Sequence, residues 1–290
     1  MKTTDKFLAF VLVAVAMIFA SCSKDDDCAQ IVADNFSRDI IGMWEGVEMT
    51  GDETNGNADA RIAYFADGTY IYYRKLADVW FPRCDETSKY SIEGSKLTTQ
   101  WKSKEAENYS SEWWDINAIK DGEMKWSALR ERKDGSQYTA TFTWKKVDDT
   151  LTSEQILAKL SGTWTDVDLT YISFLKGEIT DTKIVPGDPQ VSTTFASDGK
   201  CWFSLPNPKD PTKKVSTEYT YTLKGNVLAL VTEKREIDDE EHELATSSIR
   251  VVNSISDDQI ILVQYDEIDE ELVDLLGSDA VLILIRTKRN

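Results

Sequence analysis

His242 is the one histidine of this sequence, and histidine is the side chain best suited to acid-base catalysis near neutral pH. It lies in the acidic segment 238–243, where neighbouring carboxylates favour its charged form. A zinc-binding HExxH motif would need a second histidine at position 246, which is a threonine here. Serine–histidine or cysteine–histidine catalysis would depend on this same imidazole in a hydrophilic loop. We therefore expect no catalytic residues, no metal site and no enzymatic activity.

Carboxylates are abundant because 51 Asp and Glu residues outnumber 33 Lys and Arg residues, which gives a net charge of −18. The acidic clusters at 238–243 and 266–271 are typical of solvated loops or helix surfaces, and their spacing does not match a calcium-binding EF-hand loop. The sequence also lacks the glycine-rich loops that bind nucleotide phosphates. A strongly negative field repels nucleic acid. We expect neither a cofactor nor a nucleic-acid partner.

Cys22 is the cysteine whose position indicates a specific chemistry. It follows an uncharged run of 14 residues, 7–20, which is too short to span a bilayer comfortably and is typical of a secretory signal after a basic start. The junction Phe19-Ala20-Ser21-Cys22 resembles the lipobox of bacterial lipoproteins. The resemblance implies that residues 1–21 are a cleaved signal peptide and that Cys22 carries fatty acyl chains, palmitate among them. Two or three chains anchor a protein firmly, because each buried methylene contributes roughly 0.8 kcal/mol.

A charged run follows this cysteine after Ser23 and consists of Lys24, Asp25, Asp26 and Asp27. It resembles the export signal that places bacteroidete-type lipoproteins on the outer face of the outer membrane. The resemblance implies a lipid-anchored protein that faces the cell exterior, with residues 22–34 as an acidic tether. The alternative for the run is a solvated tether without an export role.

The alternative for Cys22 is an ordinary signal cleaved near Ala20, which would leave an incidental thiol. The remaining cysteines, Cys28, Cys84 and Cys201, are odd in number and show no CxxC spacing. They support neither a dense disulfide framework nor a zinc site, and at most one pair can form within the chain.

Three short motifs occur twice, in the same order, along the chain. They are Gly-x-Trp at 42–44 and 162–164, Asp-Gly at 67–68 and 198–199, and a Tyr-to-Gly segment at 90–94 and 221–225. The two copies are offset by 120 residues for the first motif and by 131 for the other two, so an insertion within 166–190 accounts for the change. Such self-similarity predicts two related domains, at residues 35–148 and 149–290.

Between these motifs apolar and polar residues alternate, as in antiparallel strands with one buried face. Segment 138–144 is the clearest example, and Asp-Gly and similar pairs mark the hairpin turns. Short helices are expected at 153–160, capped by Ser153, and within 266–279. About eight strands per domain predict an all-β fold with two tandem up-and-down antiparallel β-barrels.

Gly-x-Trp lies on the first strand, and the next hairpin carries Phe-x-Asp-Gly at 65–68 in the first half and Phe-x-x-Asp-Gly at 195–199 in the second. This order, with a following meander, resembles the lipocalin-like domains of bacterial lipoproteins. The resemblance implies that Trp44 and Trp164 close one end of each barrel as structural residues. It also implies a small apolar ligand inside one or both barrels. The alternation of side chains along the strands would place four residues in such a cavity: Trp101, Trp126, Tyr138 and Phe142. The alternative is that these four side chains simply fill the core of the barrel.

A second hypothesis is a non-catalytic display module that contacts glycans or partner proteins through exposed aromatic residues. Trp113 is expected to point outward if Trp114 shares the core face with Ile116 and Ala118, and Trp80 is expected in a loop. A cavity above roughly 300 Å³ would favour the ligand hypothesis, whereas a filled barrel would favour display. The Asp-Thr-Leu sequence around Thr150 resembles an O-glycosylation motif of exported bacteroidete-type proteins.

Overall fold

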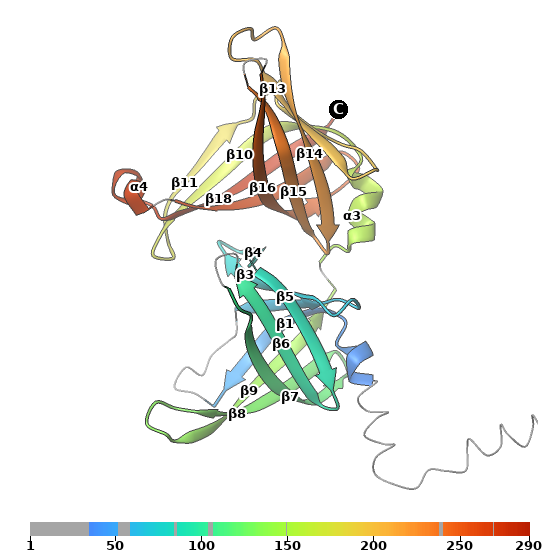
Figure 1. The fold of residues 1–290 in the computed structure, drawn as a ribbon, viewed down its shortest axis with the longest axis vertical. Coiled ribbons are helices and arrows are strands. Elements are labelled where there is room, and N and C mark those ends of the chain that lie inside the picture. The colour runs from blue at the N-terminus through green and yellow to red at the C-terminus, as the bar shows by residue number, and fades with distance from the viewer. Residues whose placement is uncertain are drawn as a thin grey trace, which may run out of the picture.

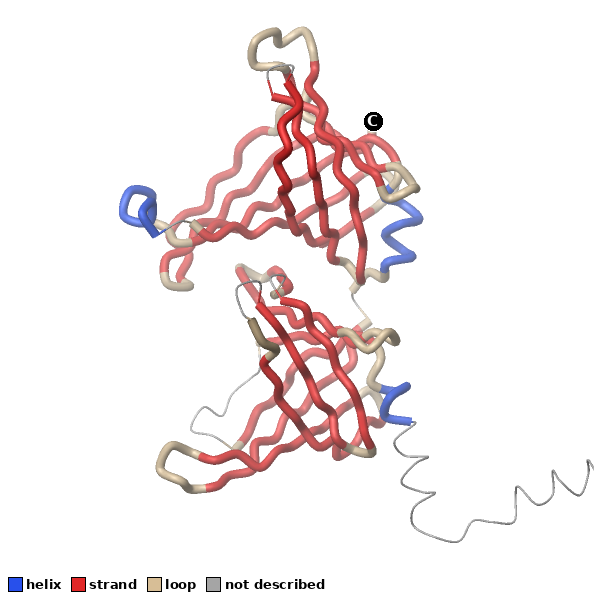
Figure 2. The backbone as a smooth tube through the Cα atoms, viewed as in Figure 1, coloured by secondary structure: helices blue, strands red, loops and turns tan. Residues whose placement is uncertain are grey.

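The computed structural model describes residues 35–51, 59–83, 86–103, 107–148, 150–237, 240–268 and 270–290. The predicted signal peptide, Cys22, the export run 24–27, Cys28 and Cys84 lie outside the described residues. The predicted all-β antiparallel architecture is confirmed, since the described residues form two nine-stranded sheets. The two sheets are stacked along the long axis of the molecule (Figure 1), and strands make up most of the backbone (Figure 2).

The first sheet has the order β4-β3-β2-β1-β9-β8-β7-β6-β5. Its strands are β1 (Gly42–Thr50), β2 (Ala60–Tyr64), β3 (Tyr70–Leu76), β4 (Val79–Pro82), β5 (Glu86–Glu93), β6 (Lys96–Ser103), β7 (Ser110–Lys120), β8 (Glu123–Glu131) and β9 (Gln137–Val147). The sheet curls so that Thr69, just before β3, makes an isolated β-bridge with Lys89 in β5, but the edge strands β4 and β5 are not paired with each other among the described residues. It is therefore a curled half-barrel, less complete than the barrel that the sequence predicts.

The second sheet has the order β11-β10-β12-β13-β14-β15-β16-β17-β18. Its strands are β10 (Gly162–Leu175), β11 (Glu178–Pro186), β12 (Ser192–Phe195), β13 (Lys200–Pro206), β14 (Lys214–Lys224), β15 (Val227–Ile237), β16 (Glu240–Ile255), β17 (Gln259–Glu267) and β18 (Ala280–Arg289). Pairing of β10 with β18 closes eight of these strands into a barrel. Strand β11 pairs with β10 outside the ring, so the insertion predicted within 166–190 forms a hairpin extension.

The repeated motifs make matched hydrogen bonds in the two halves. The indole of Trp44 donates to the carbonyl of Ile40 at 2.6 Å, and that of Trp164 donates to Leu160 at 2.8 Å. The glycine two residues before each tryptophan has a positive φ, 128° at Gly42 and 130° at Gly162, which L side chains rarely adopt. The Gly-x-Trp motif therefore positions each tryptophan against the segment that immediately precedes its strand.

The Tyr-to-Gly motif at 90–94 and 221–225 also makes equivalent hydrogen bonds in the two halves. The hydroxyl of Tyr90 donates to the carbonyl of Phe65 at 2.8 Å, and that of Tyr221 donates to Ala196 at 2.7 Å. Each tyrosine thus ties the following strands to the Asp-Gly turn of its own half, whose glycine is Gly68 or Gly199.

Two short helices flank the second barrel (Figure 1). Helix α3 (Ser153–Leu160) has the predicted bounds, but its cap is Thr152 rather than Ser153, and Thr152 forms a reciprocal capping box with Gln155. Helix α4 (Glu270–Leu276) lies within the predicted helical segment 266–279. None of the described helices is long and apolar enough to cross a membrane.

Apolar side chains from both halves pack together where β4 of the first sheet meets the outside of the second barrel. We call this group the junction cluster: Val79, Phe81, Phe174, Val251, Val263, Ala280 and Leu282. Two of its members come from β4, and Phe81 also packs 5.7 Å from the ring of Tyr265. The two halves are thus joined by apolar contact as well as by the chain between them.

Candidate ligand-binding site in the first barrel

A cavity of about 260 Å³ lies inside the curled first sheet. Eight of its twelve wall residues are aromatic, and together they are Ile62, Tyr64, Tyr70, Tyr72, Arg83, Thr99, Trp101, Glu112, Trp114, Trp126, Phe142 and Trp144. They come from neighbouring strands whose alternate side chains point inward. The cavity is therefore a product of strand alternation across most of the sheet, with large flat rings on its walls.

The rings pack against one another as well as around the space. The Trp114 and Trp126 rings are stacked with centroids 5.6 Å apart, and Phe142 and Trp144 are stacked at 5.6 Å. Trp126 also meets the edge of Trp144 at 5.1 Å. Offset and edge-on ring pairs contribute beyond the area that they bury, so these walls are held in place.

Three buried hydrogen-bond donors in the wall have no partner among the described residues. They are the hydroxyl of Tyr64 and the indole nitrogens of Trp126 and Trp144. Burial raises the pKa of Tyr64 well above its usual value, so its hydroxyl stays protonated. An unsatisfied buried donor costs roughly 1–3 kcal/mol. The cavity therefore offers three donors to any molecule or water that carries acceptors.

Charged groups lie toward the edge of this space. Arg83 is exposed, and its guanidinium lies 5.4 Å from the centre of the Tyr72 ring. Glu112 is half-buried and accepts a hydrogen bond from Arg130 at 2.8 Å. Since Glu112 is paired, the cavity wall combines an apolar interior with one accessible cation, Arg83.

The structure brings three of the four predicted cavity residues together. Trp101, Trp126 and Phe142 line the cavity. Tyr138 does not, because it lies near the start of β9, with the Arg132 guanidinium 4.4 Å from its ring centre. Tyr138 does point toward the core, as the alternation along its strand predicts. Alternation does not, however, specify how far along a strand a cavity extends.

Sequence reasoning missed the tyrosines of β2 and β3 that line the cavity. Tyr70 and Tyr72 are two positions apart on β3 and so share one face of the strand, a pattern that could have indicated that both point inward. Tyr64 lies in β2, where all five residues are buried, so no alternation identified its direction.

Trp80 is half-buried rather than an exposed contact, since the Arg61 guanidinium lies 4.6 Å from its ring centre. Trp113 is exposed at 37%, as predicted from its parity with buried Trp114. Ala118, however, is exposed because a register shift after Ile116 ends the alternation there.

Two cations crowd the ring of Trp113. The Lys96 amine lies 5.2 Å from its centre and the Arg130 guanidinium 5.6 Å.

Thr150, the candidate glycosylation residue, is half-buried and lines a 140 Å³ pocket between the two halves. Among the described residues no group of three or more His, Cys, Asp or Glu side chains is arranged to hold a metal ion.

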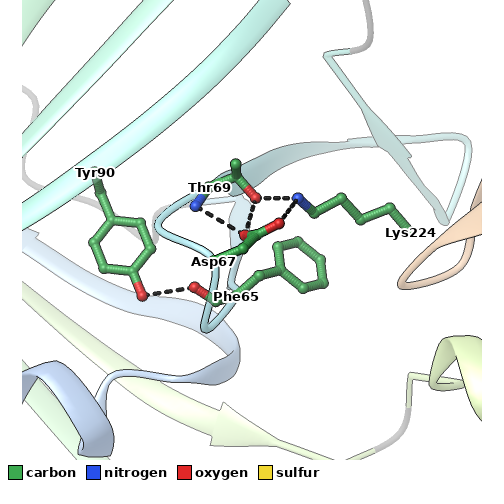
Figure 3. Close-up of polar contacts among 5 residues, drawn as sticks. All are labelled: Phe65, Asp67, Thr69, Tyr90 and Lys224. Atoms are coloured by element: carbon green, nitrogen blue, oxygen red, sulfur yellow. Dashed lines mark hydrogen bonds and ion pairs between the residues drawn. The ribbon is translucent and has the colours of Figure 1, made fainter.

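A polar contact joins the Asp67 turn of the first half to the second barrel (Figure 3). The Lys224 amine donates to the Asp67 carboxylate at 2.8 Å and also to the Thr69 hydroxyl. It lies 4.8 Å from the Phe65 ring centre. The hydrogen bonds from Lys224 and Thr69 lower the pKa of Asp67 to about 2. This contact fixes the turn that Tyr90 also holds.

The fold and the cavity define an antiparallel β-barrel protein with an aromatic interior. No protein-family model and no curated protein sequence matches the chain. Among solved structures, two engineered forms of the vaccine antigen transferrin binding protein B from Haemophilus parasuis Hp5 are similar, at 5% and 6% identity and a TM-score of 0.25. Each alignment covers 79% of this chain and 65% of the other, so the chain spans about two thirds of those structures.

A protein of unknown function of the DUF3598 family from Nostoc punctiforme is also similar, at 11% identity and a TM-score of 0.21. That alignment covers 87% of this chain and 97% of the other. Scores this low do not assign a family, so the functional argument rests on the cavity itself.

Proposed function

We propose that this protein is a surface-anchored lipoprotein whose first barrel binds a small, largely apolar ligand. The observation that carries the proposal is the 260 Å³ aromatic cavity with three unpartnered donors in its wall. Ligand sites are typically concave and apolar, with a few convergent polar groups that fix orientation. The anchoring part of the proposal rests on the lipobox-like junction before Cys22.

The cavity volume limits the ligand. At about 260 Å³ it lies just below the usual range of roughly 300–1,000 Å³ for drug-sized ligands. A flat molecule would lie against the aromatic walls of the cavity and accept hydrogen bonds from Trp126 or Trp144. The ligand is therefore a small planar or amphiphilic compound with acceptor atoms rather than a long acyl chain.

Contact with partner proteins is a second candidate, and helix α4 favours it. Three of its leucines, Leu272, Leu275 and Leu276, are exposed. Glycan stacking has weaker support, because Trp80 is half-buried and the ring of Trp113 is crowded by Lys96 and Arg130.

Native mass spectrometry of the mature chain, expressed in soluble form from Lys24, tests the ligand proposal. We expect a co-purified small molecule, or else tight binding of the neutral fluorescent probe N-phenyl-1-naphthylamine. Thr99→Phe places a ring in the cavity and should abolish both signals, whereas Trp113→Phe, on the outer face, should retain them. A chain that carries no molecule and does not bind the probe would contradict the proposal, as would equal binding by Thr99→Phe.

A further inference from the structure

The second barrel encloses a separate cavity of about 190 Å³. Its wall is mainly apolar, with Phe195, Ile260, Leu262 and Ile285 among its residues, and it contains one arginine, Arg250. The first barrel's cavity is walled by aromatic rings and offers neutral donors, so the two interiors differ in chemistry.

Strand alternation directs Arg250 inward. It lies on β16 opposite Leu228, a core residue, and on the same side of the strand as buried Val252. Val251, between them, faces outward into the junction cluster. The guanidinium of Arg250 is therefore held inside the barrel rather than at its surface.

One donor of this guanidinium has no partner within the part of the chain that the structure describes. The residue as a whole is half-buried, and its Nε is buried without a hydrogen-bond partner. Arginine remains charged in proteins, and a buried donor without a partner is costly. Burial also lowers the pKa of Arg250 from its usual value. Its Nε therefore has hydrogen-bonding capacity for an anion in the cavity.

Other titratable groups act on Arg250 electrostatically, but none of them fills its Nε donor. Asp166 on β10 lines the same cavity, and burial raises the pKa of this carboxyl. Cys201, Tyr219 and Asp266 also affect the arginine electrostatically. Gln264 also lines this cavity, and its amide nitrogen donates to Asp266 at 2.8 and 3.1 Å.

We propose that the second barrel binds a small monocarboxylate, with the carboxylate on Arg250 and a short apolar tail among Phe195, Ile260 and Leu262. A carboxylate matches the guanidinium fork in geometry and carries the single charge that one arginine can neutralise. A phosphate dianion would be left undercompensated beside Asp166. The cavity has the liquid volume of about six waters, which limits the ligand to a short acid. The site is additional to the ligand site of the first barrel.

Pentanoate with a ¹³C-labelled carboxyl group is the probe, because its length suits the small cavity. Titrated into the mature chain from Lys24, it should shift in the NMR spectrum and bind measurably by calorimetry, while 1-pentanol should bind at least tenfold more weakly. Arg250→Met keeps the length of the side chain but removes the charge, and it should weaken pentanoate binding roughly ten- to hundredfold. Arg286→Met, which removes an outer arginine paired with Asp168, should leave binding unchanged.

A second measurement uses the wild-type protein. In the ¹⁵N spectrum of its arginine Nε groups, pentanoate should shift one buried resonance, and Arg250→Lys should remove that resonance and weaken binding. The Thr99→Phe variant should still bind pentanoate, which separates this site from the first cavity. Absence of pentanoate binding by the wild type, or equal binding of pentanoate and 1-pentanol, would overturn the proposal.

Discussion

The amine of Lys224 in the second barrel lies 2.8 Å from the carboxylate of Asp67 in the first, although 157 positions separate the two residues. This ion pair lies beside a hydrogen bond between Tyr73 and Asn226, 2.9 Å long, which also crosses the junction. The turn at Asp67 in the first half is thus bound by the β14–β15 hairpin of the second half. The two halves are connected through their turns as well as through the junction cluster.

Lys224→Met should raise the pKa of Asp67 from about 2 toward its ordinary value of 3.8, because the main hydrogen-bond donor to the carboxylate is removed. Carboxyl NMR titration measures this directly. Lys200→Met is the matched control, since Lys200 pairs with Glu218 within the second barrel. A pKa of Asp67 that stayed near 2 in Lys224→Met would show that the lysine is not its partner.

The same shift gives the direction of the pH dependence. The folded-state pKa of Asp67 is lower than the unfolded value, so its stabilising contribution is present above pH 3.8 and is lost as the pH falls through about 2. The pair is partly exposed, so solvent screening keeps this contribution small. The difference in unfolding free energy between the wild type and Lys224→Met should therefore shrink over this window.

Trp44→Phe and Trp164→Phe should each destabilise their own half by about 1–3 kcal/mol, because each loses a buried hydrogen bond and leaves space behind. Urea unfolding followed by circular dichroism measures the loss. Trp113→Phe, at an exposed position, should change the free energy of unfolding by less than about 0.5 kcal/mol. Similar values for all three variants would contradict the structural role of the two buried tryptophans.

Cys201 should be unreactive in the folded protein. The thiol is buried, and burial raises its pKa to about 11, so the reactive thiolate is scarce until the pH approaches that value. In the soluble chain from Lys24, which lacks Cys22, with Cys28→Ser and Cys84→Ser, labelling by 5,5′-dithiobis-(2-nitrobenzoic acid) at pH 8 should be at least a hundredfold slower than in guanidinium chloride. Rapid labelling of the folded form would place the thiol at the surface.

Cys22→Ala should release the protein from membranes while both sheets remain folded, because lipid is the proposed attachment and Cys22 precedes every described residue. Membrane fractionation and circular dichroism measure the two outcomes. Replacing Asp25, Asp26 and Asp27 together with asparagine should retain the lipid but lower accessibility to added protease. Retention of Cys22→Ala in the membrane fraction would contradict the anchor, and unchanged accessibility would contradict the export signal.

The sequence was informative where a local rule decides the structure. Alternation and Asp-Gly turns predicted the antiparallel sheets, and the two Gly-x-Trp motifs predicted matched tryptophans that the structure places in equivalent hydrogen bonds. The helix at 153–160 was predicted with its bounds, but Thr152 rather than Ser153 caps it. Either hydroxyl suits a cap, and the choice depends on which residue leaves the helical conformation.

The errors arise where distant parts of the chain meet. Trp80 was expected at the surface, yet it is covered because Arg61 packs on its ring. Arg250 was not identified, since one charged residue in a strand gives no sign that the barrel encloses it. Incomplete closure of the first sheet likewise depends on how its end strands approach, which local alternation does not specify.

The matched bonds of Trp44 with Ile40 and of Trp164 with Leu160 have an evolutionary consequence. Duplication of one ancestral unit accounts for them, because bonds that hold a scaffold together persist while its interior diverges. The wall of one cavity is mainly tryptophan and tyrosine, and that of the other combines aliphatic side chains and three aromatic rings with an arginine. The two proposed sites would then be two compartments of different selectivity on one polypeptide.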